Sequence, residues 1–101
     1  MDNLKGKNAV ITGAASGVGA ALARALDAEG MHLLLLDRDS DGLAAIAAEL
    51  GDRPAVARVD VTRGGDLIRA AETAWERWDN VHLFINNAGV MSKMAPLWEL
   101  D

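Results

Sequence analysis

Hydrophobic and polar residues follow two alternating patterns along this chain. Nearly continuous apolar runs, each typical of a buried strand, lie at Asn8–Thr12, His32–Asp37, Ala55–Asp60 and Val81–Asn86. Between these runs, apolar residues recur at the three- and four-residue spacing of a helix. The chain is therefore predicted to run strand, helix, strand, helix, strand, helix, strand, and to end in a tail.

The predicted helices each have an apolar face. The first helix, Val18–Glu29, is followed by Gly30 as a C-terminal cap, and its face is Val18, Leu22, Ala25 and Leu26. The second helix, Ser40–Leu50, is capped by Asp39 or Ser40, and its face is Leu43, Ile46, Ala47 and Leu50. The third helix extends from about Gly65 to Trp78.

The strand runs are apolar almost throughout and do not alternate with polar residues. Four consecutive leucines, Leu33–Leu36, must be buried on both faces of a sheet. This pattern is typical of a parallel sheet that is covered by helices on both sides. Right-handed crossovers then give an α/β fold with a doubly wound sheet, in which ligands bind at the carboxyl ends of the strands.

The length and composition are those of one small domain, residues 1–101. The chain has no cysteine, which excludes disulfides, thiolate metal sites and cysteine nucleophiles, and no metal site is predicted. A net charge of −5 without a basic stripe argues against a nucleic-acid partner. No apolar run has the length of a signal peptide or a membrane span, so a cytoplasmic protein is expected.

The polar chemistry begins at Thr12–Gly19, where the first run ends. A glycine-dense turn between a strand and a helix can hold phosphate, because unpaired N–H groups and the helix dipole attract an anion there. Gly13 suits the turn, Gly17 leaves space for a pyrophosphate, and Gly19 lets the helix pack on the strand. Ser16 adds a hydroxyl within reach of a phosphate oxygen. The alternative is a glycine turn without a ligand.

Asp37 ends the second run and is placed to accept hydrogen bonds from both hydroxyls of an adenosine ribose. Its charge would repel a 2′-phosphate by about 3 kcal/mol at a distance of about 5 Å and an effective dielectric of about 20. This repulsion favours NAD over NADP. Arg38 weakens that preference, because its guanidinium could bind a 2′-phosphate. The alternative role for Asp37 is a polar strand end beside a turn.

Two further polar groups end the third and fourth runs. Asp60 is placed either to accept from an adenine amino group or to cap the next helix, and the spacing leaves both roles open. The run Asn86-Asn87-Ala88-Gly89 has small and amide residues that let a nucleotide approach the backbone and tie strand ends together. A plain turn is the alternative here.

These motifs, from Thr12–Gly19 through Asp37 and Asp60-Val61 to Asn86–Gly89, resemble the short-chain dehydrogenase/reductase family in order and spacing. The resemblance covers essentially the whole chain. It implies a Rossmann-type fold with four strands in the order 3-2-1-4, NAD or NADP as cofactor, and interconversion of an alcohol and a carbonyl compound. The predicted cofactor-binding residues are Gly13, Ser16, Gly17, Val18, Gly19, Asp37, Arg38, Asp60, Val61, Asn87, Ala88 and Gly89.

The chain also departs from the family's pattern. His82 stands where the family usually has an acid, and the family's catalytic serine and Tyr-x-x-x-Lys pair lie beyond the point where this sequence stops. The sequence has no tyrosine, so no catalytic residue is predicted, and we expect a truncated dinucleotide-binding part that is inactive alone. The run Val81–Asn86 would then be a bare sheet edge, for which self-association is expected.

Two other classes of function compete with this interpretation. One is a non-catalytic nucleotide-binding or self-associating module that uses the same fold. The other is a Rossmann-like methyltransferase, which the spacing within Thr12–Gly19 and the presence of Asn86–Gly89 disfavour.

Overall fold

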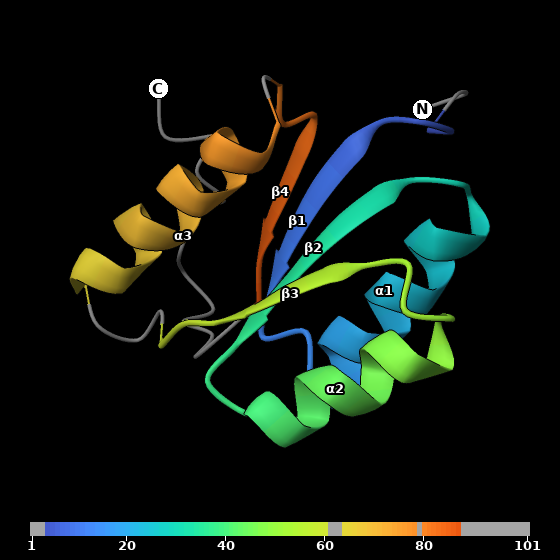
Figure 1. The fold of residues 1–101 in the computed structure, drawn as a ribbon, viewed down its shortest axis with the longest axis horizontal. Helices are drawn as coiled ribbons and strands as arrows, with labels where there is room; N and C mark the ends of the chain where they lie inside the picture. The colour runs from blue at the N-terminus through green and yellow to red at the C-terminus, as the bar shows by residue number, and fades with distance from the viewer. Residues whose placement is uncertain (1–3, 61–63, 79, 88–101) are drawn as a thin grey trace.

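The protein folds into a four-stranded parallel sheet with helices on both faces (Figure 1). The computed structural model describes residues 4–60, 64–78 and 80–87. In chain order the elements are β1 (Asn8–Thr12), α1 (Gly17–Ala28), β2 (His32–Asp37), α2 (Ser40–Glu49), β3 (Ala55–Arg58), α3 (Gly64–Arg77) and β4 (Leu83–Asn86).

The strand order in the sheet is β3-β2-β1-β4, and all three neighbouring pairs are parallel. Val10 in the middle of β1 lies beside Leu34 of β2 on one side and Phe84 of β4 on the other. The order 3-2-1-4 and the α/β fold are therefore confirmed. Because each connection crosses a face of the sheet and returns to its start, the carboxyl ends of all four strands lie at the same end of the sheet.

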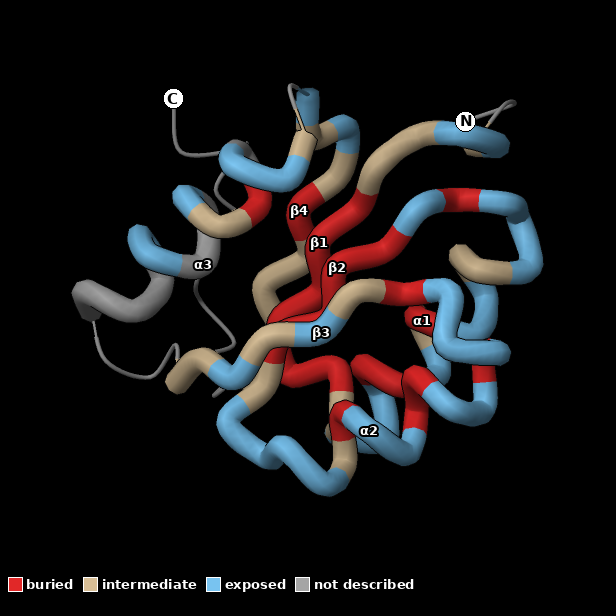
Figure 2. Tube along the Cα trace, viewed as in Figure 1, coloured by how far each residue is buried: buried red, intermediate tan, exposed pale blue. Residues whose placement is uncertain are grey.

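Each face of the sheet has its own apolar core. Helices α1 and α2 cover one face and α3 covers the other (Figure 1). Alternate leucines of β2 point to opposite sides, Leu33 and Leu35 toward α1 and α2, and Leu34 and Leu36 toward α3. The central strands are buried on both sides (Figure 2), as the run of leucines predicts.

Two strands are shorter than predicted. Strand β3 ends at Arg58 where Asp60 was predicted, and β4 begins at Leu83 where Val81 was predicted. The extra apolar residues, Val59 and Val81, pack partly buried against the core on the α3 side without strand geometry. An apolar residue beside a strand can be buried without belonging to the strand, which is why the apolar runs overestimated the lengths of β3 and β4.

The predicted face of α1 was partly wrong. Val18 is 64% exposed and Ala25 is exposed. The buried positions are the small residues Gly19, Ala20 and Ala23. These allow the helix axis to lie close to the sheet, while the larger Leu22 and Leu26 pack at the sides of the contact.

The face of α2 matches its prediction. Leu43, Ile46, Ala47 and Leu50 are all buried. Of the two candidate caps, Asp39 is the one used, and its side chain accepts a hydrogen bond of 3.0 Å from the N–H of Gly42.

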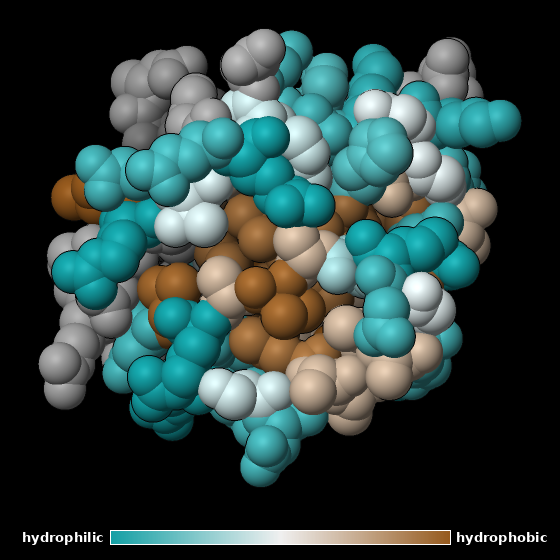
Figure 3. All heavy atoms as spheres, viewed as in Figure 1, coloured by the Kyte–Doolittle hydropathy of each residue, from teal (hydrophilic) through white to brown (hydrophobic). Residues whose placement is uncertain are grey.

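Strand β3 forms one edge of the sheet, and its burial alternates between half-buried and exposed residues. Figure 3 shows apolar atoms at the middle of the viewed face, over β3 and within a surround of hydrophilic residues. Val56 of β3 is one of the exposed large hydrophobic residues, with 44% of its surface exposed.

Candidate functional site

The candidate site lies where β1, β2 and β4 end together (Figure 1). We call residues 13–19, which connect β1 to the start of α1, the glycine turn. A backbone conformation shapes the turn, and a hydrogen bond fixes it to the sheet. Gly13 has φ +66°, a backbone conformation that glycine adopts without strain, and the N–H of Ala14 donates to the carbonyl of Leu36 at 3.1 Å.

The other two glycines of the turn have opposite surroundings. A Cβ added at Gly19 would lie 2.0 Å from the carbonyl oxygen of Gly13, so the helix packs directly on the turn. Among the described residues, a Cβ added at Gly17 would meet nothing within 4 Å. Gly19 therefore satisfies a packing requirement inside the protein, whereas Gly17 borders open space.

Ser16 is the N-cap of α1. Its hydroxyl accepts from the N–H of Gly19 at 3.1 Å and donates to the carbonyl of Gly13 at 2.7 Å. The same oxygen accepts from the side-chain amide of Asn87 at 3.0 Å. A phosphate contact from this hydroxyl would thus replace the bond to Gly13.

The N–H groups of Gly17 and Val18 point out of the first turn of α1. Within the described residues neither has a hydrogen-bond acceptor, and both residues are exposed. Free N–H groups at the positive end of a helix dipole attract an anion.

Asp37 lies half-buried at the end of β2 and joins two loops. One carboxylate oxygen accepts from the N–H of Ala15 in the glycine turn at 2.9 Å. The other accepts from the N–H of Asp39 at 3.0 Å. An ionised carboxylate has about four acceptor positions, so about two are left for the hydroxyls of a ribose. Arg38, beside it, is exposed.

A buried hydroxyl connects the end of β1 to the end of β4. Thr12 is fully buried; its hydroxyl donates to the side-chain oxygen of Asn86 at 2.9 Å and accepts from the N–H of Asn87 at 2.8 Å. The amide of Asn87 in turn reaches Ser16 of the glycine turn. Thr12 was not among the predicted site residues, although it ends the first apolar run and opens the motif Thr12–Gly19.

The remaining predicted site residues are placed only in part. Asp60 is half-buried just after β3. Val61, Ala88 and Gly89 lie outside the described residues. His82 is exposed just before β4, and its Nδ1 accepts from the N–H of Asn8 at 3.0 Å.

A sequence model of the family described as short chain dehydrogenase matches residues 7–101 of this chain. A 3beta-hydroxysteroid dehydrogenase 2 from Eggerthella lenta is 35% identical over an alignment of 101 positions, which covers 97% of this chain and 39% of that protein. The curated relatives that the chain matches over nearly all of its own length are thus more than twice as long as it is.

Solved structures agree with this match. A short chain dehydrogenase/reductase from Burkholderia phymatum in complex with NAD superposes with a TM-score of 0.74 at 39% identity, over 83% of this chain and 31% of that one. A 3-ketoacyl-(acyl-carrier-protein) reductase from Brucella melitensis complexed with NADH gives 0.73 at 33% identity, over 81% and 34% of the two chains.

Proposed function

Because the chain belongs to the short-chain dehydrogenase family, we propose that it is the dinucleotide-binding part of an NAD(P)-dependent oxidoreductase. In this proposal residues 1–101 form the cofactor-binding domain of an enzyme that interconverts an alcohol and a carbonyl compound. The observation that carries the proposal is that, within the described residues, the N–H groups of the exposed Gly17 and Val18 have no acceptor and lie beside open space at Gly17.

The geometry of the turn fits a pyrophosphate. The N–H groups of Gly17 and Val18 are suited to donate to phosphate oxygens, and the helix dipole of α1 adds about 0.3–1 kcal/mol of attraction. A side chain at position 17 would fill the space that a phosphate needs. Gly13 and Gly19 shape the turn from within.

The end of β2 fits an adenosine ribose. The acceptor positions that Asp37 has left are suited to both hydroxyls of the ribose. Its negative charge opposes a 2′-phosphate, so we propose NAD as the preferred cofactor, with NADP binding more weakly through Arg38. Asp60 and Val61 are proposed at the adenine ring, and Asn87, Ala88 and Gly89 beside the rest of the cofactor.

The bound nicotinamide would supply the hydride chemistry. The residues of this chain would bind and orient the cofactor and exclude water from it. Within the described residues no helix is both long enough and apolar enough to cross a membrane, and a cytoplasmic location stays a prediction.

The proposal is tested by titrating the chain with NADH and with NADPH in a calorimeter. We expect saturable binding of both, with NADH tighter by about tenfold or more, since about 1.4 kcal/mol separates such affinities. Equal or tighter binding of NADPH would contradict the cofactor preference. Binding of adenosylmethionine without any binding of a dinucleotide would contradict the proposed function.

A further inference from the structure

We propose that the glycine turn is held in its phosphate-binding shape by the β2–α2 segment, with Asp37 and Gly42 as positioning residues. The proposal builds on the dinucleotide site described above. It adds Gly42, which lies outside the glycine motif and is not expected to touch the cofactor, and it gives Asp37 a role that does not require a ribose.

The first contact is electrostatic. Ala15 stands in the middle of the glycine turn, and its N–H donates to the carboxylate of Asp37. The second oxygen of that carboxylate is fixed by the N–H of Asp39 at the start of α2. Hydrogen bonds to an ionised acceptor are stronger than neutral ones, so the carboxylate holds Ala15 at a defined distance from β2.

The second contact is steric. A Cβ added at Gly42, in the first turn of α2, would lie 2.6 Å from the Cβ of Ala15 and 2.6 Å from Oδ2 of Asp39. The carboxylate of Asp39 can rotate at the expense of its bond to the N–H of Gly42, whereas the Cβ of Ala15 is fixed to the backbone of the turn. Gly42 therefore lets the start of α2 lie directly against Ala15, which stops the turn from moving toward α2.

Together these contacts hold Ala15 from two sides. Ser16 and Gly17 follow immediately, so a displacement of Ala15 would move the cap and the free N–H groups of α1. The carboxylate that discriminates between cofactors thus also shapes the pyrophosphate site. Removing it to admit a 2′-phosphate would weaken binding of both NADH and NADPH.

The sharpest test uses a pair of compensating substitutions. Gly42→Ala adds the clashing methyl group, and Ala15→Gly removes its partner. We expect Gly42→Ala to weaken NADH binding about tenfold. We expect the double variant Ala15→Gly/Gly42→Ala to recover affinity to within about threefold of the original protein. The clash with Asp39, the N-cap of α2, remains in the double variant, so recovery there assigns the loss to the contact with Ala15.

Two results of this series would overturn the proposal. One is that Gly42→Ala binds NADH as tightly as the original chain. The other is that the double variant binds no better than Gly42→Ala alone, because a positioning contact must be rescued when its partner is removed.

A measurement without ligand separates this proposal from the proposed function. In the original chain the amide hydrogen of Ala15 should be protected from exchange with solvent. Asp37→Ala should speed that exchange about tenfold or more, while the amide of Val10 in the central strand keeps its protection. Unchanged exchange at Ala15 overturns the proposal. If the original chain binds no dinucleotide, the proposed function fails, and the exchange experiment, carried out on Asp37→Ala and on Gly42→Ala, still decides whether Asp37 and Gly42 shape the turn.

Discussion

Gly17 and Gly19 lie two positions apart in the same turn, yet they are glycines for different reasons. Gly19 is buried, and its Cα faces the backbone of Gly13. Gly17 is exposed and faces open space. The sequence motif predicts one role for each glycine, and substitution by alanine tests the two roles separately.

Gly19→Ala should destabilise the fold. Its methyl group would lie 2.0 Å from the carbonyl oxygen of Gly13, and the backbone must move to accept it. Overpacking of this kind costs about 1–3 kcal/mol, which lowers the melting temperature by about 4–8 °C for each kcal/mol in a domain of this size. Thermal unfolding followed by circular dichroism measures it.

Gly17→Ala is the matched control. It should leave the melting temperature within about 2 °C of the original, because its methyl group would meet no other described residue within 4 Å beyond its own stretch of helix. It should nevertheless weaken NADH binding about tenfold by occupying the proposed phosphate space. Similar melting temperatures for the two variants would contradict the packing role of Gly19.

Thr12 has a buried hydroxyl with partners on β4. Thr12→Val keeps the shape of the side chain but leaves the side-chain oxygen of Asn86 and the N–H of Asn87 without this partner. We expect a loss of about 1–3 kcal/mol in the free energy of unfolding, measured in urea. Thr12→Ser keeps the hydroxyl and should lose only about 0.8 kcal/mol for the missing methyl group. A serine variant less stable than the valine variant would refute the role of the hydroxyl.

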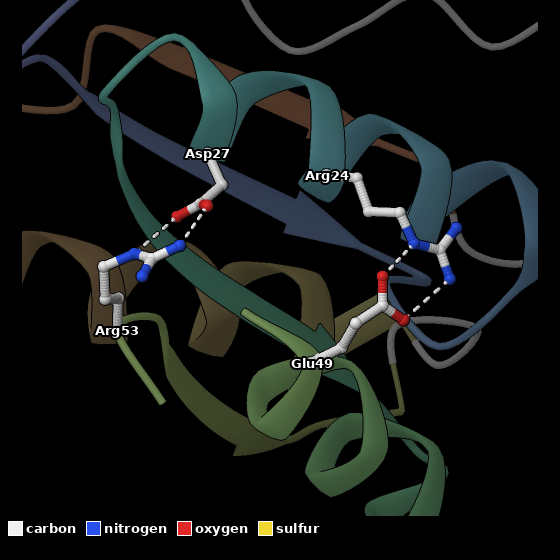
Figure 4. A network of polar contacts seen from close by, with 4 residues as sticks. All are labelled: Arg24, Asp27, Glu49 and Arg53. Atoms are coloured by element: carbon white, nitrogen blue, oxygen red, sulfur yellow. Dashed lines mark hydrogen bonds and ion pairs between the residues drawn. The ribbon is translucent and has the colours of Figure 1, made fainter. Parts of the chain in front are cut away.

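At the scale of secondary-structure elements, ion pairs join α1 to its neighbours. Arg24 of α1 makes two hydrogen bonds to Glu49 at the end of α2, and Arg53 after α2 makes two to Asp27 of α1 (Figure 4). The pairing with Glu49 raises the pKa of Arg24, and that with Asp27 raises the pKa of Arg53. Because the pairs lie near the surface, added salt should weaken them.

The pair between Arg24 and Glu49 predicts a pH dependence of stability. The hydrogen bond from Arg24, together with its charge, outweighs desolvation and lowers the pKa of Glu49 below its ordinary 4.5. The pair therefore contributes its full stability above that value and loses it as pH falls through the lowered pKa.

Urea unfolding of Glu49→Gln at two pH values measures this effect. The variant should be less stable than the original at about pH 7, and the difference should shrink at about pH 3. Glu72→Gln, at an exposed position of α3, is the control and should show a smaller change. A difference for Glu49→Gln that is the same at both pH values would contradict the pairing.

At the scale of the whole molecule, the sheet has two edges, β3 and β4. Within the described residues, β4 pairs only with β1, and Phe84 in its centre is buried. An apolar strand with one unpaired edge is a template for another strand. We therefore propose that copies of this chain associate through β4.

Sedimentation equilibrium over a range of protein concentrations tests this association. The weight-average mass should rise with concentration, because strand pairing between copies follows mass action. Val56→Lys, which places a charge at the exposed β3 edge, should leave the association unchanged. A monomer at every concentration would refute the proposal, and loss of association in Val56→Lys would assign the contact to β3.

Much of the fold could be predicted because it depends on local periodicity. The run Leu33–Leu36 shows burial on both faces of a sheet, and the spacing of Leu43, Ile46 and Leu50 shows which face of α2 is buried. The rotation of α1 could not be predicted in this way, since Val18 and Ala25 fit a helical stripe as well as Ala20 and Ala23 do. The close contact between α1 and the sheet favours Ala20 and Ala23, because both side chains are small.

The sequence by itself determined the order of elements, the parallel sheet and the position of the glycine turn between the first strand and the first helix. These follow from local periodicity and from backbone conformations that only certain residues adopt easily. Only the tertiary structure decided that Asp37 holds Ala15, that Thr12 holds Asn87, and that Gly42 leaves room for the turn. Those contacts join residues far apart in the chain, and their distances depend on how strands and helices pack in space.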